Sequence, residues 1–342
     1  MFDEVEIANR RSKLSLTKRD LLAKILREAA ESKTETTIRK RDPLKPLALS
    51  FHQQRLLSLA LLEPDDGTYN ISRKVTLKGP LNTAVLLDAV NHIFERHESL
   101  RTSFRIVDGE WQQWIEPLVE LPIPTIDLSG RSEAQRRDEI TRFARQQARE
   151  PFNLARAPLL RGMLLRLNET EHVLLLTMSH LISDGWSVDV FFRELQSHYE
   201  AFSAGEPSPL PALPIQYGDY ANWHREKVEG GSLDQQRDYW REQLADAPPA
   251  LELLTDKPRR SAGSAEGARQ TFWISPHEAQ QLREFAQRHG LSLFMLLLSA
   301  FEALLVRYTG QHDVCVGVPA AQRSPKELED LIGFLVNTLV LR

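Results

Sequence analysis

The chain has 342 residues, of which 42% are hydrophobic and 26% are charged, and its formal net charge is -4. This composition is ordinary for a folded globular protein, and the length predicts about two domains. The 43 basic residues are spread along the chain among 47 acidic ones, so no basic stripe indicates a nucleic-acid partner.

The sequence carries no signal for secretion, membrane insertion or metal binding through cysteine. Residues 1–6 are acidic and lack the basic and apolar regions of a signal peptide. No segment approaches the ~20 consecutive apolar residues of a membrane span. The single cysteine, Cys315, leaves no intrachain disulfide and no Cys-based zinc site. We therefore expect a cytoplasmic protein with no metal site and no membrane partner.

Residues 1–46 differ in composition from the rest of the chain. Apolar residues at helical spacing predict an amphipathic helix between residues 14 and 31, and one such helix is not stable alone. Residues 32–46 are basic and proline-containing, which indicates a solvated linker. The helix is interpreted either as a docking element for an upstream protein or as an extension that lies on the main domain.

The first half of the folded region alternates strands and helices. A half-buried strand around Val75 precedes a helix that Asn82 can cap, and a hairpin is predicted at Asp108-Gly109. A second helix covers residues 132–150. Two strands, near residues 159–167 and 173–178, follow it and are joined by a polar turn.

The stretch from Val173 to Met178 is almost continuously apolar, which predicts a strand that is covered on both faces. Polar residues gather at its end: His180 and Asp184 are followed by Gly185, which permits a sharp turn. Ser187 is predicted to cap the next helix.

An imidazole at the end of a rigid strand is suited to proton transfer, because it titrates near pH ~6.5 when unperturbed. His180 is therefore a candidate general base. The H-x-x-x-D-G spacing alone also fits a hydrogen-bonded turn without a catalytic role, so the choice depends on the rest of the chain.

The second half has its own strand and helix signals. Three aromatic residues between Tyr217 and Trp223 could simply fill a core, and a domain boundary is predicted near residue 226. Ser275 begins a helix with a capping box, Ser292 begins the next helix, and residues 314–318 predict a buried strand.

Five short motifs occur in the order in which they stand in the condensation domains of non-ribosomal peptide synthetases, and the chain resembles that family. The motifs are LSFHQQRL at 49–56, RHESLRTSF at 96–104, SHLISDGWS at 179–187, YGDYANW at 217–223 and IGFLVNTLVLR at 332–342. The first motif and the residue after it depart from the family pattern SxAQxRLW at His52 and Leu57. The third motif departs from HHxxxDG at Ser179, which stands in place of the first histidine.

The resemblance implies an α/β fold of two chloramphenicol-acetyltransferase-like subdomains, which form a V-shaped pseudo-dimer with a tunnel between them. The N-terminal subdomain would cover residues 47–225 and the C-terminal subdomain residues 226–342, after the helix and linker of residues 1–46. The fifth motif is expected to form a buried parallel strand. Family members continue past this motif, so we expect the second subdomain to be incomplete and the chain to be truncated there.

The resemblance also implies an acyltransferase that forms an amide bond between a donor acyl or peptidyl thioester and the α-amine of an acceptor aminoacyl thioester. Both substrates would be tethered to carrier proteins through 4'-phosphopantetheine, and the domain itself would bind no cofactor. Its partners would be donor and acceptor peptidyl carrier proteins and an adjacent adenylation domain. Residues 182–187 resemble the subtype that joins an L-configured donor to an L-configured acceptor.

Residue roles follow from the same resemblance. His180 would orient or deprotonate the attacking amine, Arg96 would pair with Asp184 to brace the turn, and Gly185 would let the backbone approach the substrate. Ser179 would point away from the tunnel, because neighbouring strand residues face opposite sides. The remaining residues assigned to the substrate tunnel and its walls are Arg101, Trp186, Ser187, Trp223 and Asn337.

Three alternatives stay open. A heterocyclization domain would carry Asp at position 179 and lose the histidine, whereas His180 is present. A plant-type acyltransferase would show a late DFGWG motif, which this sequence lacks. The third is a carrier-protein binding module or fragment that is catalytically impaired by Ser179 or by truncation.

Overall fold

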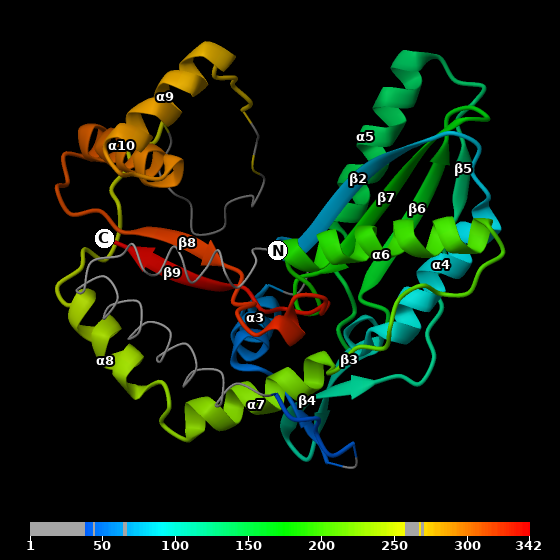
Figure 1. Cartoon of the computed structure of the whole chain (residues 1–342), viewed down its shortest axis with the longest axis horizontal. Helices are drawn as coiled ribbons and strands as arrows, with labels where there is room; N and C mark the ends of the chain where they lie inside the picture. The colour runs from blue at the N-terminus through cyan, green and yellow to red at the C-terminus, as the bar shows by residue number, and fades with distance from the viewer. Residues whose placement is uncertain (1–37, 44, 64–66, 257–266, 268–269) are drawn as a thin grey trace, which may run out of the picture.

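The computed structural model describes residues 38–43, 45–63, 67–256, 267 and 270–342. The helix predicted at residues 14–31 lies outside the described residues, as does part of the linker. Within the described residues, a four-stranded sheet with its helices forms one arm of the molecule. A second arm carries a two-stranded sheet and two helices (Figure 1).

The four-stranded sheet has the order β2-β7-β6-β5. Its strands are β2 (Asn70–Lys78), β5 (Thr125–Asp127), β6 (Leu160–Arg166) and β7 (Glu171–Ser179). β7 is antiparallel to both of its neighbours, and β5 is parallel to β6. The polar turn predicted between the last two strands is therefore confirmed.

The strand β7 is buried on both faces, as its apolar run predicted. Its alternate residues enter two separate cores. Leu174, Leu176 and Met178 pack with α4 (Thr83–Arg96) and α6 (Gly185–Ser203).

The opposite face of the sheet is covered by α5 (Glu133–Arg149). Val173 and Leu175 of β7 belong to a smaller core, against which Ile140 and Phe143 of α5 pack. Both faces of β7 are thus fixed by helices, so the residues that follow Ser179 leave a rigid strand.

A second sheet has the order β1-β4-β3, formed by β1 (Leu47–Ala48), β3 (Thr102–Val107) and β4 (Glu110–Ile115). The predicted hairpin at residues 108–109 is confirmed, with φ of 53° at Asp108 and 84° at Gly109. Positive φ at both central residues matches the twist of the flanking strands.

The helix α3 (Phe51–Leu62) starts at Ser50 with a capping box completed by Gln53. A short 3-10 helix (Glu98–Arg101) connects α4 to β3.

The remaining helices are α7 (Tyr217–Glu229), α8 (Asp234–Gln243), α9 (Pro276–Arg288) and α10 (Leu293–Thr309). The predicted caps at Ser275 and Ser292 are confirmed. The boundary predicted near residue 226 falls in the last turn of α7, whose C-cap is Gly230.

The strand predicted at residues 314–318 occurs as β8 (Val316–Ala320) and pairs with β9 (Asn337–Leu341). Two expectations were wrong here. β8 alternates between half-buried and exposed residues, and β9 is antiparallel to its neighbour rather than a buried parallel strand. Among the described residues no third strand pairs with β8 or β9, and a two-stranded sheet contributes little stability by itself.

Between β8 and β9 the chain leaves the two-stranded sheet and packs on the first arm. Residues 321–336, which include a short 3-10 helix (Lys326–Leu328), contribute Leu331 and Leu335 to a core with Tyr217 and Tyr220 of α7. This crossing segment therefore packs on the first arm while both of its ends lead into the two-stranded sheet of the second arm.

No single helix among the described residues has the length and apolar character to cross a membrane. α9 and α10 have the length and apolar composition of a membrane span only when they are taken together, and their axes are bent by 102° with respect to each other.

Substitution of Gly333 by alanine should destabilise the protein by about 1 to 3 kcal/mol, the usual cost of overpacking a core. A Cβ atom there would lie 2.0 Å from Cδ2 of Tyr217, and this ring cannot yield easily because its hydroxyl is hydrogen-bonded to Ser50 and to the carbonyl of Phe334, each at 2.9 Å. Urea unfolding would measure the loss. Gly130→Ala is the control, since its Cβ would meet nothing within 4 Å; equal stability of the two variants would contradict the packing argument.

Candidate active site

His180 follows the last residue of β7 and is held by its backbone and its ring. Its backbone N–H donates to the carbonyl of Tyr69 at 2.8 Å, which ties the turn to β2. Its Nδ1 lies 2.8 Å from the carbonyl oxygen of Ser183. Because a carbonyl can only accept, Nδ1 carries the proton of the neutral ring and Nε2 keeps a lone pair. The local geometry therefore presents a base at Nε2.

The turn after β7 is closed by its own hydrogen bonds. The Ser183 hydroxyl donates to the Ser179 carbonyl at 2.9 Å, and the Ile182 N–H donates to the same carbonyl at 3.2 Å. The Ser179 hydroxyl accepts from the Leu181 N–H at 3.3 Å. Ser179 thus supports the turn through a hydrogen bond of its side chain.

Asp184 caps α6, so the prediction that Ser187 is the N-cap was wrong. The Asp184 carboxylate accepts from the backbone N–H of Ser187 at 2.8 Å and from that of Leu335 at 3.1 Å. Its position three residues before the Ser187 N–H is the usual geometry of a side-chain cap. The hydroxyl of Ser187 lies 2.7 Å from the same carboxylate.

The charge partner of Asp184 is Arg323, and the predicted pairing of Asp184 with Arg96 was wrong. The Arg323 guanidinium lies 3.0 Å from Asp184 Oδ1, and each side chain is only 2% exposed. Arg323 also donates to the carbonyls of Leu328 and Leu331 at 2.6 and 2.5 Å. Burial lowers the pKa of Arg323, against the opposing effect of the Asp184 carboxylate.

Arg96 instead pairs with Glu194 of α6, at 3.0 Å between Nε and Oε1. Arg96 is at the C-terminal end of α4, and α4 packs along α6, so the carboxylate one helix away is the partner within reach. The other oxygen of Glu194 lies 2.9 Å from Nε2 of the buried His97.

The protonation states in this second cluster follow from its burial. Burial alone would raise the pKa of Glu194, but the hydrogen bond from His97 and the charge and hydrogen bond of Arg96 outweigh it and lower the pKa. Burial lowers the pKa of His97 in spite of Glu194. A neutral His97 fits its contacts, because Nδ1 accepts from the Ile332 N–H at 3.4 Å while Nε2 donates to Glu194.

Both clusters hold the crossing segment against the first arm. Its backbone at residues 331–335 is bound at almost every position by side chains of the first arm and α7. The Ser99 hydroxyl donates to the Ile332 carbonyl at 2.7 Å, and the Gly333 N–H donates to the Ser187 hydroxyl at 3.1 Å. As a result, the ring of Phe334 packs edge-on against His180, with ring centroids 4.8 Å apart.

A row of rings continues from Phe334 into α3 and α7. His52 lies edge-on to Phe334, with centroids 6.1 Å apart, and stacks on His224 at 5.0 Å, which in turn stacks on Tyr220. The pKa of His52 is lowered to about 4, first by burial and then by His224 and Arg55. Burial likewise lowers the pKa of His224 and raises the pKa of Tyr220. These rings therefore pack as uncharged groups near neutral pH.

Two of the predicted tunnel residues make structural contacts instead. The guanidinium of Arg101 donates to backbone carbonyls at the end of α4 and after β4, among them that of Phe94 at 2.8 Å. Trp223 is half-buried in the core of α7 and lies beneath Lys227, whose Nζ is 4.7 Å from its ring. Within the described part of the chain, neither side chain contacts His180.

Residues 180–184 are called the catalytic turn, after the role proposed for His180. Gly185 and Trp186 follow it as the first residues of α6, and Asn337 is the first residue of β9. Trp186 is exposed, and its indole N–H donates to the Glu329 carbonyl at 2.8 Å. Gly185 has ordinary negative φ, and an added Cβ would meet nothing within 4 Å, so the sharp turn does not depend on glycine. Asn337 begins β9 opposite Ala320.

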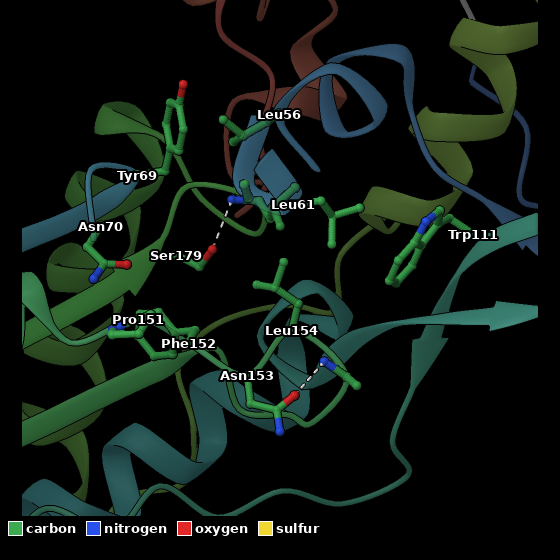
Figure 2. A pocket seen from close by; sticks show the side chains of 13 residues that line it. Leu56, Leu61, Tyr69, Asn70, Trp111, Pro151, Phe152, Asn153, Leu154 and Ser179 are labelled. Atoms are coloured by element: carbon green, nitrogen blue, oxygen red, sulfur yellow. Dashed lines mark hydrogen bonds between the residues drawn. The ribbon is translucent and has the colours of Figure 1, made fainter. Parts of the chain in front are cut away.

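A cavity of ≈ 300 Å³ lies beside the catalytic turn, with Ser179 in its wall (Figure 2). His180 is not part of its lining. The cavity lies between α3, the start of β2, β4 and the segment 151–155.

The described residues contain no group of three or more His, Cys, Asp or Glu side chains that could hold a metal ion. His180 lies at the end of a buried strand, and the turn that holds it is braced by the buried ion pair of Asp184 and Arg323. This arrangement suits acid–base or acyl-transfer chemistry.

Comparison with known proteins identifies the family. The family model of the condensation domain matches residues 45–342, so the chain belongs to the condensation-domain family. It is 44% identical over 311 residues to a linear gramicidin synthase of Brevibacillus parabrevis, a match that covers 89% of this chain and 6% of that protein. It is 38% identical over 338 residues to the phosphinothricin tripeptide synthetase PhsC of Streptomyces viridochromogenes, covering 98% of this chain and 31% of that protein. The chain thus spans a small part of these relatives.

Solved structures confirm the fold class. The X-domain from teicoplanin biosynthesis superposes with a TM-score of 0.80 at 26% identity, over 90% of this chain and 67% of that one. The first condensation domain of the CDA synthetase has a TM-score of 0.73 at 23% identity, over 87% and 71%. The predicted mixed α/β, chloramphenicol-acetyltransferase-like class is therefore correct.

Sequence reasoning missed four residues that build the site: His52, Glu194, Arg323 and Phe334. Arg323 had no local signal, because its partner Asp184 lies 139 residues away. Phe334 lies within the fifth motif, but the motif alone does not show that its ring packs against His180. Glu194 could have been found, since helical spacing places this acidic residue on the same face of α6 as the buried Val190, Phe191 and Leu195.

Removal of Arg323 should cost about 3 to 5 kcal/mol, because Asp184 would remain as a buried charge without its cation. Arg323→Ala can be compared with Arg193→Ala by urea unfolding. Arg193 pairs with Asp330 at 2.6 Å on the surface, with both side chains more than half exposed, so its loss should cost at most about 1 kcal/mol. Equal effects of the two substitutions would contradict the role given to Arg323.

The lowered pKa of His52 predicts that acid destabilises the protein. Between the unfolded value of 6.5 and the folded value of about 4, the unfolded state binds more protons, so the free energy of unfolding falls as the pH falls. His52→Phe keeps a ring beside Phe334 and His224 but cannot titrate. From pH 7 to pH 5 the variant should lose about 2 kcal/mol less than the parent. Parallel pH profiles in urea unfolding would show that His52 is not linked to stability.

Proposed function

We propose that this chain acts as a condensation domain of a non-ribosomal peptide synthetase and joins a donor acyl or peptidyl thioester to the α-amine of an acceptor aminoacyl thioester. The observation that carries the proposal is the ring of His180, whose Nδ1–H is committed to the Ser183 carbonyl so that Nε2 is the basic atom. Membership of the condensation-domain family supports the reaction class.

The reaction requires one new bond, one broken bond and one proton transfer. The acceptor amine attacks the carbonyl carbon of the donor thioester, so a C–N bond forms and the C–S bond breaks. His180 Nε2 orients the amine or takes its proton, and the departing thiolate receives a proton to leave as a thiol. Two reactants held in line lose less entropy on reaching the transition state, so positioning contributes alongside proton transfer.

The other residues act on His180 rather than on the substrate. Asp184 and Arg323 hold the turn and the crossing segment together, and Phe334 limits the orientation of the imidazole. Arg96 and Glu194 fix α4 to α6 beneath the turn. In this assignment Arg101 and Trp223 support the scaffold, and Trp186 and Asn337 remain candidates for contact with a bound substrate.

The partners follow from the proposed reaction. The substrates would arrive on the 4'-phosphopantetheine of donor and acceptor peptidyl carrier proteins, with an adenylation domain adjacent and no cofactor held by the domain. Residues 182–187 favour L-configured donors and acceptors. Residues 14–31 are proposed as an upstream docking segment, and the cytoplasm as the location.

A second candidate is a binding module that holds carrier proteins without catalysis. Ser179 supports it, because the family motif has histidine there. A further point is the likeness to an X-domain that has been solved in complex with OxyB, at 25% identity and a TM-score of 0.79. Binding of both loaded carrier proteins without product, together with amide formation gained only on Ser179→His, would favour this module.

His180→Ala should lower amide formation by about 10² to 10⁴-fold, the usual contribution of a general base. The assay supplies the purified chain with two loaded carrier proteins and measures the amide product by mass spectrometry. His289→Ala, which changes an exposed ring at the end of α9, should retain parental turnover. Unchanged thermal melting of both variants would show that folding is intact, and near-parental turnover of His180→Ala would remove His180 from the mechanism.

A further inference from the structure

The cavity beside the catalytic turn is lined mainly by hydrocarbon. Figure 2 shows Leu56 and Leu61 above it, Trp111 on one side and Leu154 below. Leu61 is 48% exposed, whereas Ser179 is 5% exposed, so the cavity runs from an open edge at α3 to a closed end at the strand.

Three of the polar side chains in the wall, those of Asn70, Asn153 and Ser179, already have partners within the protein. Asn70 donates to the carbonyls of Ala148 and Glu150, each at 2.9 Å. Asn153 accepts from the Ala155 N–H at 3.1 Å, and Ser179 accepts from the Leu181 N–H at 3.3 Å. No charged side chain lines the cavity within the described part of the chain. A charged ligand would therefore lose its hydration without a counter-charge, whereas an apolar group would not.

The closed end of the cavity is part of the catalytic turn. Ser179 precedes His180 in the chain, so their Cα atoms are about 3.8 Å apart. Tyr69, which also lines the cavity, accepts the backbone hydrogen bond of His180. Ser179 and Leu181, the residues that flank His180 in the chain, both line the cavity, whereas His180 does not.

The volume suits one large side chain. A dry cavity of ~150 Å³ already holds a benzene ring, and this cavity measures ≈ 300 Å³. A pocket with few polar groups and a preformed shape is typical of sites that recognise apolar ligands.

We infer that this cavity is a side-chain pocket for a tethered substrate and that it takes an aromatic or branched aliphatic group. The inference rests on the proposed function, because it assumes aminoacyl or peptidyl substrates. Ser179 sets the depth of the pocket, and Ala60 faces it from α3.

Direct binding tests the pocket without requiring turnover. The probes are pantetheine amides of phenylalanine, leucine and glycine, in which nitrogen replaces the thioester sulfur, titrated calorimetrically into the 342-residue chain. The phenylalanyl and leucyl probes should bind at least about tenfold more tightly than the glycyl probe, since burial of such a side chain contributes about 1.5 to 3 kcal/mol.

A matched pair of substitutions on α3 locates the binding. Ala60→Phe places a ring in the cavity and should weaken the phenylalanyl probe by about tenfold or more, with Ala60→Leu as the smaller alternative if the first variant does not fold. Ser58→Phe adds the same ring at an exposed position of the same helix and should leave binding unchanged. Equal affinity for all three probes, or equal effects of the substitutions at positions 58 and 60, would overturn the inference. If the selectivity is found and no amide forms with loaded carrier proteins, the pocket stands and the catalytic proposal fails.

Discussion

The buried pair of Asp184 and Arg323 is the interaction on which the site depends. Asp184 ends the catalytic turn and starts α6, and Arg323 opens the segment that crosses back from the second arm. Two charges that are removed from water are stable only when their remaining hydrogen-bonding groups are also satisfied. Here the carboxylate accepts backbone hydrogen bonds from Ser187 and Leu335, and the guanidinium donates to two backbone carbonyls. The pair therefore positions backbone on both sides as well as neutralising charge.

The position of the base follows from this arrangement. The strand β7 is fixed by cores on both faces, and the crossing segment is fixed by Asp184, Ser187 and the cluster of Glu194. His180 lies between them, with Ser183 defining its tautomer and Phe334 packing on its ring. An imidazole that is held by packing and one hydrogen bond needs little reorganisation to take part in the proposed reaction.

The sequence predicted what is local and failed where distant segments meet. The buried strand, the hairpin at Asp108-Gly109 and the caps at Asn82 and Ser275 depend on a few neighbouring residues, and all were correct. The cap of α6 was misassigned because Asp184 and Ser187 both have capping side chains, and only the geometry decides between them. The partner of Asp184 could not be predicted from the sequence. Arg96 and Arg323 carry the same side chain, and the distance of each to Asp184 is set by the whole fold.

The separation of Asp184 from Arg323 along the chain has a consequence for how the protein is made. The two residues are 139 positions apart, and a ribosome that adds ~5 to 20 residues per second needs roughly 7 to 28 s to synthesise that length. During this interval β7 and α6 can pack with α4, because all three are already synthesised, while the carboxylate of Asp184 stays in water. The catalytic turn therefore reaches its final geometry only when residues far downstream have been translated and the long loop has closed.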